Sequence, residues 1–122
     1  MTSRIVGIHH VQLAMPAGGE DSARRFYGDV LGLKEISKPE HLASRGGCWF
    51  RGDDVELHLG VEASFTAARK AHPAFDVSDL DSLRRALEEA GAEVVEDTQL
   101  EGFRRFYSAD PFGNRLEFLA TE

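Results

Sequence analysis

The chain of 122 residues is poor in cysteine, in long apolar runs and in positive charge. Its only cysteine is Cys48, so no disulfide can form within the chain, which suits a reducing compartment. No apolar run approaches the roughly 18 residues that a membrane-spanning helix needs, and the first residues lack the apolar core of a signal peptide. The formal net charge is -7 and there is no block of Lys or Arg, which argues against non-specific nucleic-acid binding. These absences predict a cytoplasmic protein whose partners are small molecules, with no nucleic acid and no membrane among them.

The residues that are present predict an ordinary globular domain. Hydrophobic residues make up 42% and charged residues 29% of the chain, which is enough to build a core without disulfides. Cys48 lies in the apolar run Cys48-Trp49-Phe50 and has no neighbour in sequence that would lower its pKa, so we expect a buried structural thiol.

The two halves of the chain repeat one pattern. When His10 is aligned with His72, apolar residues follow each histidine at the first, third and fifth positions, which is the alternation of a strand. The strands expected on this basis are residues 8–15 and 70–77. Each is followed by an apolar stripe of helical period, over residues 20–31 and 79–90, that ends before a glycine. Three further strands are expected in each half: 33–37, 47–51 and 54–61, then 93–96, 103–108 and 114–120.

The last strand of each half carries a glutamate in the same register. Gly52 precedes Glu56 by four positions, and Gly113 precedes Glu117 by four, with apolar residues on both sides of each glutamate. The apolar residues of these strands occupy one face, so the glutamates belong to the opposite, polar face. The prediction is one domain over 1–122, made of a first unit at about 5–61, a linker at 62–70 and a second unit at about 71–120.

Two histidines and two glutamates at equivalent positions of duplicated units predict a shared site. For any one of these residues the simpler interpretation is a solvated sheet face, but the repeat favours convergence of His10, Glu56, His72 and Glu117. Two imidazoles and two carboxylates suit Ni, Co, Zn, Mn or Fe(II). Such a centre polarises a carbonyl and stabilises an enediolate.

These motifs resemble the vicinal-oxygen-chelate superfamily, which includes glyoxalase I, bleomycin-resistance proteins and extradiol dioxygenases. The resemblance spans about residues 5–120 and rests on four segments: 8–13 (IHHVQL), 25–33 (RFYGDVLGL), 71–77 (AHPAFDV) and 110–119 (DPFGNRLEFL). It implies an α+β fold of two paired βαβββ modules that form a cupped, mostly antiparallel sheet. It also implies that the divalent metal is held by His10 and Glu56 of the first module and His72 and Glu117 of the second. Members often exchange modules between subunits, so a homodimer is expected.

Two histidines near the predicted ligands leave alternatives open. His9 neighbours His10, but strand alternation points it to the opposite face. His58 shares the face of Glu56 and could replace it as ligand, act as a general base or be a polar surface residue. Binding by His10, His72 and Glu117 alone would give a two-histidine, one-carboxylate triad, which favours oxygen activation or thiol transfer to fosfomycin.

Three functions follow from this pattern. The first is a metal-dependent lyase, isomerase or epimerase that acts on a small oxygen-rich substrate through a metal-bound enediolate, with Glu117 or His58 moving the proton. The second is a metal-free antibiotic-binding protein of the bleomycin-resistance type, and the third is an Fe(II) dioxygenase. The segments 37–47 and 97–104 are expected to be loops. Four arginines are candidates for holding an anionic substrate: Arg45, Arg51, Arg104 and Arg105.

Overall fold

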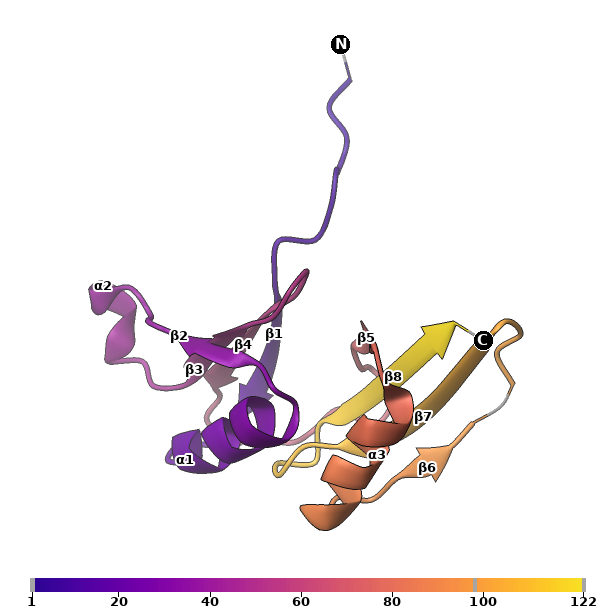
Figure 1. Cartoon of the computed structure of the whole chain (residues 1–122). Coiled ribbons are helices and arrows are strands. Elements are labelled where there is room, and N and C mark those ends of the chain that lie inside the picture. Colours follow the sequence, from indigo (N-terminus) through magenta and orange to yellow (C-terminus); the bar gives the residue numbers. More distant parts are fainter. Residues whose placement is uncertain (1, 98, 122) are drawn as a thin grey trace.

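The computed structural model describes residues 2–97 and 99–121, which form two four-stranded mixed sheets with helices beside them (Figure 1). The first sheet has the order β1-β4-β3-β2 and the second β5-β8-β7-β6. In each sheet the first strand is parallel to the last, and the remaining pairs are antiparallel. The strands are β1 Val11–Met15, β2 Lys34–Ile36, β3 Cys48–Arg51, β4 Glu56–Val61, β5 Ala74–Asp76, β6 Val95–Glu96, β7 Phe103–Ala109 and β8 Arg115–Thr121. The fold is therefore α+β, with the predicted duplication of one unit.

The helices lie where the apolar stripes predict them, with one irregularity. Helix α3 spans Leu80–Glu89, and the Asp79 carboxylate caps it by accepting a hydrogen bond from the Ser82 amide. The first helical segment begins as α1, Glu20–Ala23, and continues as a π-helix, η1, Arg24–Val30. Both helical segments end before a glycine of positive φ, Gly32 or Gly91, as the sequence predicts.

Two expectations about local structure are wrong. The segment 37–47 was expected to be a loop but holds the short helix α2, Glu40–Ala43, directly after Pro39. The first strands were expected to include both histidines, but β1 begins at Val11 and β5 at Ala74. The cause for β1 is its pairing partner, because Val11 pairs with Leu57 and β4 begins only one residue earlier. Among the described residues, no strand pairs with the chain upstream of Val11.

The apolar faces of the strands form the core with the helices. Leu57 and Leu59 of β4 and Leu116 and Phe118 of β8 are buried, as the alternation predicts. Cys48 is buried among them, as expected, and its burial raises the pKa of the thiol to about 11. Among the residues described, no helix is long and apolar enough to cross a membrane.

The turn between β7 and β8 joins the two halves of the chain. The buried Asp110 carboxylate accepts a hydrogen bond of 2.6 Å from the Tyr27 hydroxyl of η1. The side-chain amide of Asn114 donates to the carbonyl of Ala14 in β1 at 2.8 Å and also to Asp110. The halves therefore meet through the helical layer and this turn, while their sheets remain separate.

Removal of the Tyr27 hydroxyl should destabilise this junction. In a Tyr27→Phe variant the buried Asp110 carboxylate loses one donor, so we expect the free energy of unfolding to fall by about 1–3 kcal/mol. Urea denaturation followed by circular dichroism measures the change. Tyr107→Phe is the control, because its hydroxyl has no hydrogen bond among the described residues. Equal stability of the Tyr27→Phe variant and the parent would contradict this role of the junction.

Candidate metal centre

The second half of the chain holds a partly buried histidine–carboxylate pair. His72 lies two residues before β5, and Glu117 lies in the middle of β8 with 6% of its surface exposed. The separation between His72 Nε2 and Glu117 Oε1 is 2.9 Å. The other ring nitrogen, Nδ1, lies 2.6 Å from the Lys70 carbonyl oxygen, which can only accept a hydrogen bond.

This arrangement fixes where the imidazole carries its hydrogen. Because the Lys70 carbonyl requires a hydrogen on Nδ1, Nε2 of a neutral ring presents a lone pair to the Glu117 carboxylate. Two facing acceptors need a cation, either a second proton on the ring or a metal ion. The observed separation is that of a hydrogen bond, and Nε2 and Oε1 are also the donor types that would hold a divalent ion.

Arg105 holds the other oxygen of Glu117. Its Nη1 donates to Glu117 Oε2 at 3.2 Å, and its Nη2 donates to Asp97 at 3.1 Å. Burial alone would raise the pKa of Glu117, but the hydrogen bonds from His72 and Arg105 outweigh it and leave the pKa below its ordinary value. Glu117 is therefore held with Oε1 directed toward His72 and Oε2 toward Arg105.

The first half holds a second pair on the equivalent face. His58 Nε2 lies 2.8 Å from Glu56 Oε2, and Arg51 donates to Glu56 Oε1 at 2.8 Å. Hydrogen bonds from Arg51, and then from His58, lower the pKa of Glu56 to about 2. His58 is only 4% exposed and lies between two rings, those of Trp49 at 3.8 Å and His10 at 4.2 Å. His10, Glu56 and His58 therefore share one side of the first sheet.

The structure does not bring the two halves of the predicted site together within one chain. Over residues 2–97 and 99–121, no group of three or more His, Cys, Asp or Glu side chains could hold a metal ion. His72 meets Glu117, and His10 meets His58, but each group stays on its own sheet. The halves are connected through the hydrogen bonds at Asp110 and Asn114, and no strand of one sheet pairs with a described strand of the other. The four-ligand set stays a prediction.

The prediction that His9 points away from His10 across a strand is wrong. Both residues lie before β1, where strand alternation does not apply, and their Nδ1 atoms are 2.9 Å apart. His9 is thus not directed to the opposite side of a sheet.

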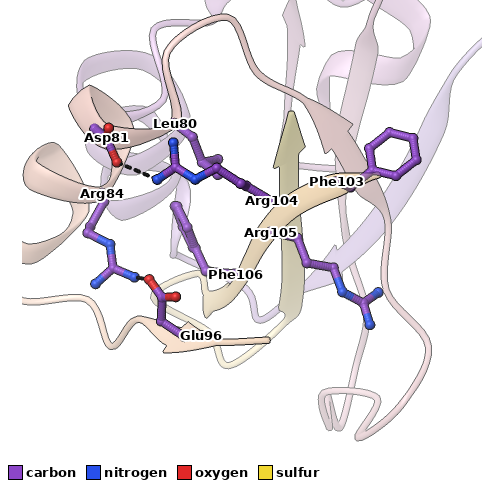
Figure 2. Close-up of a pocket in the computed structure, with 8 residues that line it drawn as sticks. All are labelled: Leu80, Asp81, Arg84, Glu96, Phe103, Arg104, Arg105 and Phe106. Atoms are coloured by element: carbon purple, nitrogen blue, oxygen red, sulfur yellow. Dashed lines mark hydrogen bonds and ion pairs between the residues drawn. The ribbon is translucent and has the colours of Figure 1, made fainter. Parts of the chain in front are cut away.

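Three of the four candidate arginines are neutralised by carboxylates. Arg51 pairs with Glu56, and Arg105 with Asp97 and Glu117. Arg104 pairs with Asp81 beside a cavity of about 90 Å³ between α3 and β7, and Arg84 in the same cavity pairs with Glu96 (Figure 2). Figure 2 shows Arg105 pointing away from Arg104, as neighbours on a strand do. The fourth, Arg45, is exposed.

The sequence analysis did not single out Arg115, which lies near the His72–Glu117 pair. The Arg115 guanidinium carbon lies 4.3 Å from the centre of the Tyr107 ring, and this ring meets the His72 ring edge-on at 5.3 Å. Arg115 precedes Glu117 by two positions in β8, so both lie on the same face. That spacing was a signal available in the sequence.

Comparison with known proteins identifies the family. The sequence model of the Glyoxalase/Bleomycin resistance protein/Dioxygenase superfamily matches residues 7–118. The chain belongs to this superfamily. No curated protein matches it significantly.

Solved structures of the superfamily share the fold over the whole chain. A protein from Bacillus anthracis assigned to the glyoxalase family is 48% identical, with a TM-score of 0.95 and 100% of both chains covered. A glyoxalase/dioxygenase from Nostoc punctiforme is 23% identical, with a TM-score of 0.78 and coverage of 100% of this chain and 99% of that one. A variant of FosX, a fosfomycin resistance protein from Listeria monocytogenes, is 19% identical, with a TM-score of 0.80 and coverage of 98% and 95%. It was crystallised with Mn(II) and 1S,2S-dihydroxypropylphosphonic acid.

Proposed function

We propose that this protein is a divalent-metal-dependent enzyme, a lyase, isomerase or epimerase acting on a small oxygen-rich substrate. The observation that carries the proposal is the His72–Glu117 pair, in which a ring nitrogen and a carboxylate oxygen, both of the types that bind divalent metals, lie 2.9 Å apart. Membership of the superfamily and the Mn(II) bound to FosX support it.

The residues present fit a divalent ion. His72 and Glu117 form one half of the ligand set, and His10 and Glu56 supply the other half with the same donor types. When bound, Ni, Co, Zn, Mn or Fe(II) would supply Lewis-acid polarisation of substrate oxygens. Two carboxylates also neutralise the charge of the ion, which offsets the cost of placing it in a partly buried site.

The chain's own residues divide the remaining work. Arg105 holds Glu117 Oε2, which leaves Oε1 as the atom that faces His72. His58, when its Nε2 donates to Glu56, keeps a lone pair on Nδ1 and can accept a proton from substrate there. Trp49 stacks on His58 and shields one face of the ring from water. Glu117 is the second candidate for moving a proton.

A homodimer would complete the site. Each chain keeps its two ligand pairs on separate sheets, so the first sheet of one copy can meet the second sheet of another. Residues 2–10 project away from β1 as an arm, in which Ile5 and Val6 are each 93% exposed and Ile8 is 83% exposed (Figure 1). An arm of nine residues can reach about 30 Å. Three exposed apolar side chains within four positions mark a contact surface. We propose that a second copy of this chain covers this surface.

A second candidate function is metal-free binding of a small molecule. It is favoured by one observation, which is that Arg51 and Arg105 already pair with the two carboxylates of the proposed ligand set. A protonated His72 would then take the place of the metal beside Glu117.

Metal content separates the two functions. The experiment is elemental mass spectrometry on protein purified without a tag or chelator, and again after reconstitution with Ni, Co, Mn, Zn and anaerobic Fe(II). Metal-dependent catalysis predicts about one divalent ion per chain, because two equivalent sites form per dimer. Absence of metal after every reconstitution would contradict the proposal and favour metal-free binding.

A further inference from the structure

A second cavity, of about 310 Å³, opens on the same side of the second sheet as Glu117. The sheet register explains its position, because Val95 pairs with Tyr107 and Ala109 pairs with Arg115, so these four side chains share one face. Tyr107 also pairs with Glu117, which places the His72–Glu117 pair in the adjoining row. A volume of this size suits a small molecule. The cavity is lined by Glu93, Val95, Tyr107, Ser108, Ala109 and Arg115.

Arg115 is the cation of this cavity without a carboxylate partner. Over the described residues, no Asp or Glu side chain lies within ion-pair distance of its guanidinium, whereas Arg51 pairs with Glu56 and Arg105 pairs with Asp97 and Glu117. Its guanidinium carbon lies over the Tyr107 ring, 4.3 Å from the ring centre. A half-buried guanidinium on an aromatic face keeps its donors directed outward, so an anion entering the cavity would meet them.

The surrounding charges favour an anion of single charge. Glu93 lies at the same cavity, and the neighbouring Arg105 is already neutralised by Asp97 and Glu117. One guanidinium fork matches the two oxygens of one carboxylate, whereas a doubly charged phosphate would face Glu93 with only one cation to balance it. Arg115 and Glu117 are two residues apart on β8, or about 6.7 Å along the strand.

From these observations we infer that Arg115 anchors the carboxylate of a small substrate whose other oxygens reach the site at Glu117. The inference rests on the proposed function for its second part, because it names the substrate class of that same site. Arg115 is then the residue that selects carboxylate-bearing substrates over neutral ones.

The test uses chelator-treated protein and a matched pair of probes, propionate and its neutral analogue propionamide. Titrations followed by amide and Arg side-chain NMR should show that propionate shifts the resonances of Arg115 and Tyr107 and that propionamide does not. Arg115→Gln should weaken propionate binding about tenfold, since it removes a charge-assisted pair of hydrogen bonds. Arg115→Lys should lie between the two, because it keeps the charge and loses the fork. The control is Arg85→Gln, an exposed arginine of α3.

The outcomes separate this inference from the proposed function. Equal binding of propionate by the parent and by Arg115→Gln, or equal shifts with propionamide, would overturn the assignment of Arg115. Tighter binding of inorganic phosphate than of propionate would overturn the carboxylate class. Because these titrations contain no metal, a protein that binds propionate but never retains metal would fail only the proposed function.

Discussion

A Glu117→Gln variant is expected to lose affinity for divalent metal by a factor of about 100 or more, since changes even to the supports of ligands cost up to that much. The substitution keeps the size of the side chain but removes the negative charge whose pKa the structure holds below its ordinary value. It also leaves Arg105 facing a neutral amide. Isothermal titration with the metal that the parent retains measures the loss.

The matched control for this variant is Glu88→Gln on α3. Glu88 has the same charge but lies on the surface, 4.0 Å from Arg84. We expect parental metal affinity in this control. Parental affinity in Glu117→Gln as well, with an intact fold by circular dichroism, would show that the His72–Glu117 pair is an internal ion pair and not half of a metal site.

A double substitution in the arm, Ile5→Asp with Val6→Asp, is expected to convert a dimer into a monomer. Both side chains are 93% exposed within one chain, so the change costs nothing in an isolated copy. In the proposed dimer it would bury two charges in an apolar contact, which is strongly unfavourable. Size-exclusion chromatography with light scattering at micromolar concentration measures the change in mass.

The control for the arm is Thr2→Asp with Ser3→Asp, which adds the same charge to exposed polar positions of the same segment. This variant should remain a dimer. A monomeric parent, or a dimer that survives the Ile5 and Val6 substitutions, would remove the arm from the interface. The monomeric variant should also lose metal, because its two ligand groups no longer meet.

The sequence predicts the repeat, the faces and the helix ends because these depend on local rules. Asp79 caps α3 and Gly91 follows it, as expected from the residue types that such positions prefer. Alternation also places Leu57 in the core and Glu56 on the polar face. Local rules could not predict where β1 begins, since that depends on where its parallel partner, β4, begins.

The candidate site is predicted less completely, for a related reason. Residue type and register single out His72 and Glu117, and the structure places them in contact. The partners of the arginines are chosen by tertiary packing, so nothing in the sequence predicts that Arg105 would hold Glu117 or that Arg115 would lie on Tyr107. The junction at Asp110 joins residues far apart in the chain and has no local signature.

Subunit complementation tests the central claim, a metal site shared between two copies, most directly. Neither His10→Ala nor Glu117→Ala should retain metal as a pure dimer. Heterodimers of the two variants, purified through different affinity tags that are then removed, combine the intact His10 of one chain with the intact Glu117 of the other. The account predicts about one ion per heterodimer by elemental mass spectrometry. Heterodimers that retain no metal, although the parent dimer does, would contradict a shared site and place all the ligands within one chain.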